Sequence, residues 1–133
     1  MHPNGKHRGT TVRFYRWAVP YIKEIRLWFR RRFGIEISVI DVVAASLHGL
    51  PDIPVVDVQR IALSLPDLGM GVITHARPSV LRTLKTHAAR LQKSMPVNLT
   101  LIVTTAIVLY AEVLRTVDAV EQKGGGHEGH DHH

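Results

Sequence analysis

Two stretches of the sequence, residues 1–33 and 77–93, concentrate basic side chains that could bind phosphate. The first stretch holds nine Lys and Arg residues against one acid, and the second holds five against none. Twelve of the 17 basic residues in the chain are Arg, whose planar fork matches phosphate oxygens. Two unmixed cationic stretches predict a surface that neutralises a polyanion. The predicted DNA-binding residues are Lys6, Arg8, Arg13, Arg16, Lys23, Arg26, Arg30, Arg31, Arg32, Arg77, Arg82, Lys85, Arg90 and Lys93.

The first basic stretch also contains seven of the eight aromatic residues of the chain. Three interpretations of this combination stay open. Arg and Lys can bind phosphates while the aromatic rings stack or fill a protein interface. A helix on a membrane surface has the same composition, and so does a helix whose rings dock on its own core. The second basic stretch favours nucleic acid, because two basic faces can clamp a rod.

Several classes of site are excluded or disfavoured by the residues present. The chain has no Cys, which excludes disulfides, thiolate metal sites and a Cys nucleophile. Gly69 and Gly71 lack the third glycine of a dinucleotide fingerprint and predict a turn. No obvious pair with a Ser or His at a catalytically useful helical spacing is formed by Asp41, Asp52, Asp57 or Asp67. We therefore expect no catalytic residue, no cofactor and no enzyme activity. No signal-peptide pattern opens the chain, so we expect no secretion.

The residues at the end of the chain combine histidines with two acids. They are His127, His130, His132, His133, Glu128 and Asp131. Such side chains can chelate a divalent metal. The glycines before them provide no rigid geometry, so we expect a solvated tail and no metal site.

Apolar periodicity predicts helices throughout the rest of the chain. Residues 11–33 have apolar side chains at three- and four-residue steps, with Pro20 either kinking one helix or opening a second, and Gly34 ending it. Ser38 and Asp41 form a capping-box pattern before the next helix. Residues 52–65 predict a shorter helix, although 55–58 could be extended. Residues 78–94 predict an amphipathic helix with its bases opposite its leucines.

Residues 97–122 predict the longest helix. Leu99, Val103, Ala106, Tyr110, Val113, Val117 and Val120 follow a strict alternation of four- and three-residue steps. This spacing is typical of a seam buried against other helices. The uncharged run 94–111 is near the length of a membrane span, but its Pro, Asn and Thr residues favour a buried bundle helix. The predicted subunit-interface residues are Trp17, Tyr21, Trp28, Leu99, Val103, Tyr110, Val113 and Val117.

These elements predict an all-α fold, a helical bundle with an extended, Pro-kinked, basic N-terminal helical arm. The predicted organisation is a DNA-wrapping arm at 1–33, a helical bundle domain at 34–122 and a flexible Gly- and His-rich tail at 123–133. Because no base-reading motif is present, we expect DNA binding without sequence preference.

The Arg- and aromatic-rich stretch VRFYRWAVPYIKEIRLWFRRRFG, ahead of a Cys-free helical bundle, resembles the major capsid proteins of filamentous archaeal viruses. These include the rudivirus, lipothrixvirus and tristromavirus groups. The resemblance implies paired subunits, as a homodimer or as a heterodimer with a related capsid protein, that wrap double-stranded DNA in A-form inside a helical nucleocapsid. It also implies a virion location after assembly in the host cytoplasm, and in several members a lipid envelope.

The expected function is therefore that of a structural nucleoprotein which coats and packages double-stranded DNA in a helical filament. Two alternatives stay open. One is a small histone-like or helix-turn-helix DNA-binding dimer, and the other is a peripheral membrane protein that uses residues 11–33.

Overall fold

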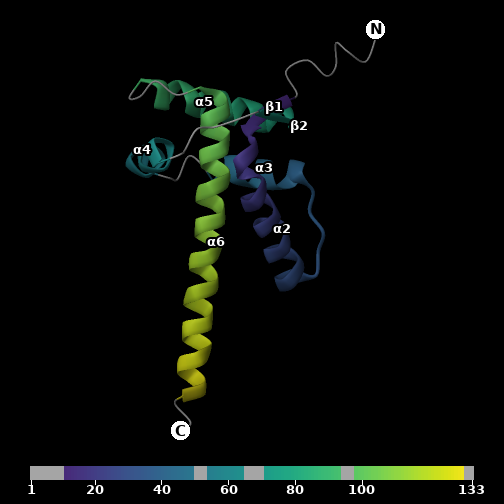
Figure 1. Ribbon diagram of the computed structural model, residues 1–133, viewed down its shortest axis with the longest axis vertical. Helices are drawn as coiled ribbons and strands as arrows, with labels where there is room; N and C mark the ends of the chain where they lie inside the picture. The colour runs from purple at the N-terminus through teal and green to yellow at the C-terminus, as the bar shows by residue number, and fades with distance from the viewer. Residues whose placement is uncertain (1–10, 50–53, 65–70, 94–97, 131–133) are drawn as a thin grey trace.

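The computed structural model describes residues 11–49, 54–64, 71–93 and 98–130, and this part of the chain is mostly helical (Figure 1). The elements in chain order are strand β1 (Thr11–Tyr15), the 3-10 turn η1 (Arg16–Ala18), helices α2 (Val19–Phe33), α3 (Val39–His48) and α4 (Val55–Ser64), strand β2 (Gly71–His75), and helices α5 (Pro78–Gln92) and α6 (Leu99–His130).

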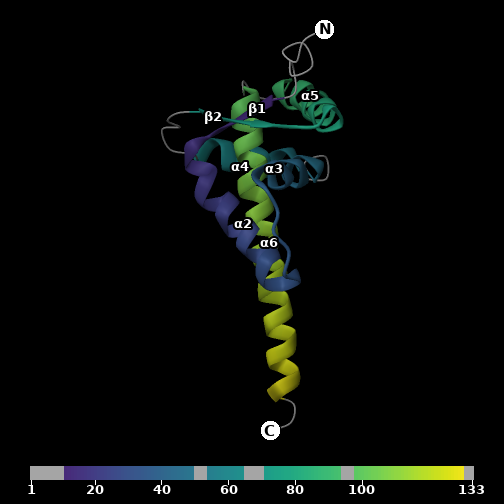
Figure 2. The same cartoon turned by 90° about the vertical axis from the view of Figure 1, so that its right-hand side faces the viewer.

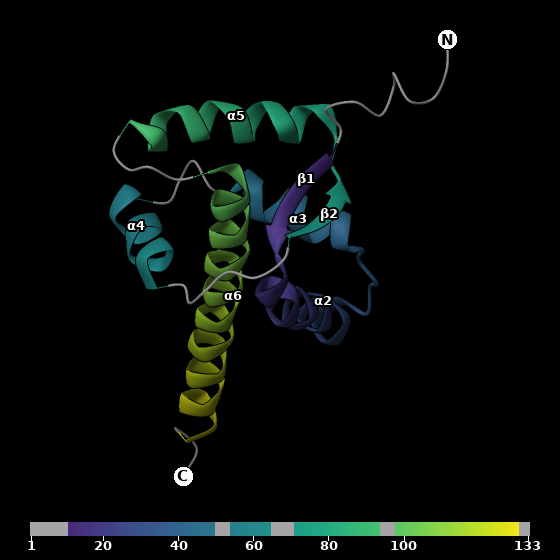
Figure 3. The same ribbon diagram turned by 45° about the horizontal axis from the view of Figure 1, so that its top comes forward.

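Helix α6 is the centre of the fold. Its residues 102–109 are all buried, because β1, η1 and the other four helices contact it. Helix α5 lies across the N-terminal end of α6, and α2 runs beside its middle (Figure 3). The C-terminal part of α6 extends beyond every other element (Figure 2). The apolar core therefore surrounds only the N-terminal part of this helix.

The small sheet corrects the predicted all-α fold. Strand β1 pairs antiparallel with β2, with Thr11 opposite His75 and Tyr15 opposite Gly71. Val12 and Phe14 are buried while Thr11 and Arg13 are exposed, which is the two-residue alternation of a strand. The helix predicted to start at Thr11 is therefore wrong for these five residues. Gly71, predicted as part of a turn, begins β2, and Gly69 lies outside the described residues.

Of the two predictions for Pro20, the structure confirms that a helix opens there and contradicts the kinked arm. Pro20 lies in the first turn of α2, where its missing N–H breaks no helical hydrogen bond, so α2 is not kinked there. Ala18, Ile22 and Ile25 belong to the same core cluster as the later helices. Residues 11–33 are thus part of the main fold rather than an extended arm, because their apolar side chains pack on this chain itself. Gly34 ends α2 in the left-handed conformation, as predicted.

The predictions for the middle of the chain are confirmed. The capping box opens α3, with the Asp41 N–H donating to Ser38 Oγ and the Ser38 N–H donating to an Asp41 carboxylate oxygen. Helix α4 lies inside the range predicted as a short helix. Helix α5 begins at Pro78.

Helix α6 differs from its prediction at both its end and its seam. The helix continues to His130, past the expected end at Gln122 and into the predicted tail, since each added residue extends a helix already nucleated. Val103 is buried, but Leu99, Val113 and Val120 are 41%, 50% and 65% exposed. The segment Leu99–Gln122 is apolar and long enough to span a membrane, but more than half of its most apolar window is buried in this fold.

Candidate nucleic-acid interface

Some of the predicted DNA-binding arginines of α2 contact other groups of this chain instead. The Arg30 guanidinium lies 3.2 Å from the Glu36 carboxylate, and Arg26 Nε donates to the Ile37 carbonyl oxygen at 2.8 Å. These two contacts hold the segment after α2 against the helix. The cationic stripe predicted along this helix is therefore partly neutralised by its own chain.

A second cluster joins the end of α2 to α6. Trp28 Nε1 donates to Asp118 Oδ1 at 2.8 Å, and Arg32 Nη1 donates to the same oxygen at 3.1 Å. Arg32 also pairs with Glu121, and its guanidinium lies 4.9 Å from the centroid of the Trp28 ring. Trp28, predicted as a subunit-interface residue, and Arg32, predicted as a DNA-binding residue, thus bind α6 of the same chain.

The middle of α2 is fixed by an ion pair that the sequence analysis did not predict. Arg115 on α6 donates to both carboxylate oxygens of Glu24, at 2.5 and 2.6 Å. Hydrogen bonding from Arg115 lowers the pKa of Glu24, and the positive charge of Arg31 contributes to the same lowering. The Arg115 guanidinium also lies 5.6 Å from the centroid of the Tyr21 ring.

The remaining predicted interface aromatics also pack within the chain. Trp17 and Tyr21 are half-buried against the core and meet edge to face, with ring centroids 5.5 Å apart. Tyr110 on α6 is half-buried as well, and its burial raises the pKa of its phenol. These rings therefore contribute to this chain's own stability, whatever they contact in an assembly.

Helix α5 shows the opposite arrangement. Its Leu81, Leu84, Ala88 and Leu91 face the core, which leaves the basic residues on the outer face. Arg82, Lys85 and Lys93 are exposed and have no carboxylate partner among the described residues. Arg90 lies 3.2 Å from Nε2 of the buried His87, which accepts because a guanidinium can only donate. Helix α5 therefore presents charge that nothing in this part of the chain neutralises.

A groove of about 570 Å³ follows the outer face of α5. It is lined by Ser79, Arg82, Thr83, Thr86, His87 and Arg90. The hydroxyl of Thr83 donates to the Ser79 carbonyl oxygen and remains able to accept. Guanidinium and hydroxyl groups along one helix face are the groups that hold phosphate oxygens. No described carboxylate lines this groove.

The other predicted DNA-binding residues are distributed over different parts of the surface. Arg13 on β1 is exposed and lines the same cavity as Lys85, so it lies near α5. Arg16, Lys23 and Arg31 are exposed on η1 and α2. Arg77 lies at a long 3.9 Å from the Asp41 carboxylate, which pairs it only weakly. Lys6 and Arg8 lie outside the described residues.

The predicted seam of α6 separates into two parts. Leu99 and Val103 line a cavity near α5, whereas Val113 and Val117 line a groove of about 440 Å³ between α4 and α6. At that groove Arg60 pairs with Glu112 at 3.4 Å. Part of the seam, such as Val103, therefore belongs to the core, whereas Val113 is exposed at the surface.

No group of three or more His, Asp or Glu side chains among the described residues could hold a metal ion. Comparison of the chain with models of known protein families, with curated proteins and with solved structures finds no match in any of the three.

Proposed function

We propose that this protein is a structural nucleoprotein that coats double-stranded DNA without sequence preference. The observation that carries the proposal is the outer face of α5. Arg82, Lys85 and Lys93 are exposed there without a carboxylate partner in the described part of the chain. By contrast, Arg30 and Arg32 on α2 and Arg115 on α6 are paired with acids. Placing free cations on one face costs electrostatic self-repulsion, which a bound polyanion relieves.

The proposed DNA-contact surface is narrower than the set predicted from the sequence. It consists of Arg13, Arg82, Lys85, Arg90 and Lys93, and we call it the α5 surface. Its guanidinium and ammonium groups would neutralise phosphates, and the hydroxyls of Thr83 and Thr86 would accept or donate hydrogen bonds at the backbone. None of these side chains forms the pattern of a base-reading motif.

Assembly is proposed to use the exposed part of the α6 seam. Val113 and Val120 are exposed on a helix that extends beyond the rest of the fold, so a second subunit could cover them. The resemblance to filamentous archaeal virus capsid proteins supports a helical filament of homodimers or heterodimers in a virion. Under the same proposal the DNA could be held in A-form, and a lipid envelope could lie outside.

The salt dependence of DNA binding tests the electrostatic part of the proposal. Each phosphate contact contributes about −0.9 to the slope of log K against log salt, so five contacts predict a slope of about −4 to −5. Filter binding with two unrelated duplexes should give the same slope and affinity for both. A slope near zero, or a strong preference for one duplex, would contradict the proposal.

Electron microscopy of the protein mixed with linear DNA tests the coating. Continuous helical filaments are the expected result. Isolated footprints along the DNA would instead support a discrete histone-like dimer, and flotation with liposomes in the absence of DNA would support a peripheral membrane protein.

A further inference from the structure

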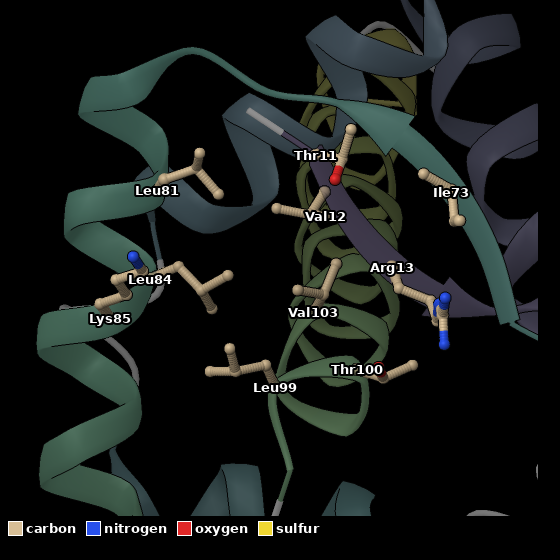
Figure 4. Close-up of a pocket in the computed structure, with 10 residues that line it drawn as sticks. All are labelled: Thr11, Val12, Arg13, Ile73, Leu81, Leu84, Lys85, Leu99, Thr100 and Val103. Carbon is tan, nitrogen blue, oxygen red and sulfur yellow. The ribbon is translucent and has the colours of Figure 1, made fainter. Parts of the chain in front are cut away.

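Strand β2 is paired on one side only within the described part of the chain, where β1 is its sole neighbour in the sheet. Helix α3 contacts β2, and the side chains of Val72 and Thr74 are half-buried. Ile73 lies on the other face of the sheet, next to Arg13 on β1, and is 60% exposed (Figure 4). One face of β2 therefore packs on the fold, while its outer face is open to solvent.

A hydrogen bond on β1 shows which backbone groups of β2 face outward. The Tyr15 N–H donates to Thr104 Oγ1 at 2.8 Å, so it does not bond to the residue opposite it on β2. Bonded and non-bonded pairs alternate in an antiparallel ladder, so the next pair, Phe14 with Val72, is bonded and Ile73 is not bonded to β1. The N–H and C=O of Ile73 therefore point away from β1. Neither group has a hydrogen-bond partner in the part of the chain that the structure describes.

The composition of β2 does not protect this edge. Residues 71–75 contain no Asp, Glu, Lys, Arg or Pro, and their register with β1 is unbroken. Charged side chains, Pro and bulges are the devices that usually stop an edge strand from pairing with another chain. Val72, Ile73 and Thr74 are β-branched, which favours an extended strand. The edge is therefore suited to pair with another uncharged strand.

We infer that β2 pairs antiparallel with β2 of a second copy of this chain, about a two-fold axis at Ile73. The N–H of each Ile73 donates to the Ile73 carbonyl oxygen of the other copy, which satisfies all four groups. The two Ile73 side chains cover each other on the outer face, and no like charges meet, because neither strand is charged. The chain's own residues 1–10 fit this edge less well, because they contain Pro3 and two glycines, which form strands poorly.

This edge is separate from the exposed seam of α6. Strand β1, which carries β2, packs against Thr104 near the start of α6, whereas Val113 and Val120 lie further along that helix. A pair of five-residue strands buries little surface, so we expect the pairing at high local concentration and not in dilute protein. A subunit with two self-pairing surfaces joins two neighbours, as a filament requires. That consequence rests on the proposed assembly through α6, but the pairing of β2 does not.

Cross-linking of single-cysteine variants tests the pairing, because the natural chain has no Cys. In the proposed pair the two Cα atoms at position 73 lie about 5.5 Å apart, within the range that a disulfide spans. Oxidised Ile73→Cys should therefore form a disulfide-linked dimer, both in concentrated protein without DNA and in protein bound to DNA. Thr11→Cys is the matched control, because Thr11 is exposed but lies on β1, and the β1 strands of the two copies are three strand spacings apart, about 14 Å.

Dimers of Ile73→Cys without dimers of Thr11→Cys are the expected result. Equal cross-linking of the two variants would show random collision and overturn the assignment, and no cross-linking of Ile73→Cys in either condition would overturn the pairing. Cross-linking in the concentrated protein alone would support the pairing and contradict its use on DNA.

Hydrogen exchange of the natural chain without DNA, followed by nuclear magnetic resonance, is an independent test. The Ile73 amide should exchange about tenfold or more slowly in concentrated than in dilute protein. The Val72 amide, which bonds to β1, should be protected equally in both. Protection of Ile73 at every concentration would show that other residues of the same chain cover the edge, and lack of protection at every concentration would overturn the pairing.

Discussion

Arg115 and Glu24, which are 91 residues apart in sequence, form a bidentate ion pair between α6 and α2. The pair fixes the rotation of α2 about its own axis, because Glu24 must face α6. It also lowers the pKa of Glu24 below its ordinary value of 4.5 and raises that of Arg115. The protonation of Glu24 is therefore coupled to the packing of α2 on α6.

Removing this ion pair should destabilise the fold in a pH-dependent manner. Because the folded-state pKa of Glu24 is lowered, its contribution is present above pH 4.5 and is lost as pH falls through the lowered folded value. For a partly exposed pair we expect a coupling energy of about 0.5–1 kcal/mol at pH 7. Urea unfolding of Glu24→Gln, Arg115→Met and the double variant measures it. The same coupling at pH 7 and at pH 2.5 would contradict the linkage.

Paired and unpaired arginines should differ in DNA binding. Arg82→Ala removes an exposed, unpartnered charge and should weaken binding to any duplex and reduce the salt slope by about one. Arg30→Ala removes the same side chain from an ion pair with Glu36 and should change the slope much less. Filter binding at several salt concentrations compares the two variants. Equal losses would show that the α5 surface has no special role.

Loss of the Asp118 carboxylate should loosen α2 from α6. Asp118→Ala leaves Trp28 Nε1 without its acceptor and removes one of the two carboxylates that Arg32 contacts. The free energy of unfolding should therefore fall by about 1–2 kcal/mol. Thermal unfolding measures the loss of stability. The fluorescence emission of Trp28 should also shift to longer wavelength, because its ring becomes more exposed to water. Glu121→Ala is the matched control: Glu121 also contacts Arg32 but is more exposed, so a loss below about 0.5 kcal/mol is expected. A larger effect of the control would move the anchoring role to Glu121.

A negative charge on the exposed seam of α6 should prevent assembly without unfolding the subunit. Val113 is 50% exposed, so Val113→Glu should leave the melting temperature within a few degrees of the parent. Sedimentation should show loss of the dimer and of any larger assembly. Ala119→Glu adds the same charge to an exposed position elsewhere on this part of α6 and should assemble normally. If both variants assemble, the interface lies elsewhere.

The helices could be predicted from sequence because their signals are local. Ser38 and Asp41 are three residues apart, Gly34 ends its own helix, and Pro78 starts one. Strand β1 was missed because Phe14 and Ala18 are four residues apart, which imitates a helical step across the boundary between β1 and η1. Its partner, β2, lies some 60 residues away, and no local pattern reveals such a pairing.

The candidate site was predicted only in part, for a related reason. Sequence shows where charge occurs but not which acid lies near it in space. Asp118 pairs with Arg32, which lies 86 residues earlier, so the basic stripe of α2 is less free than the sequence suggests. Helix α5 kept its predicted free charge because the sequence around it, residues 77–93, contains no acid.

Helix α6 follows, in chain order, every element that packs on it. A ribosome makes the chain from its N-terminus, so β1 and α2 to α5 leave the exit tunnel before α6 does. Ile25, Leu47 and Leu84, buried in the finished molecule, have no central partner during that interval. These apolar side chains therefore stay exposed to solvent until α6 emerges, and this is the stage at which the nascent chain is most prone to aggregate.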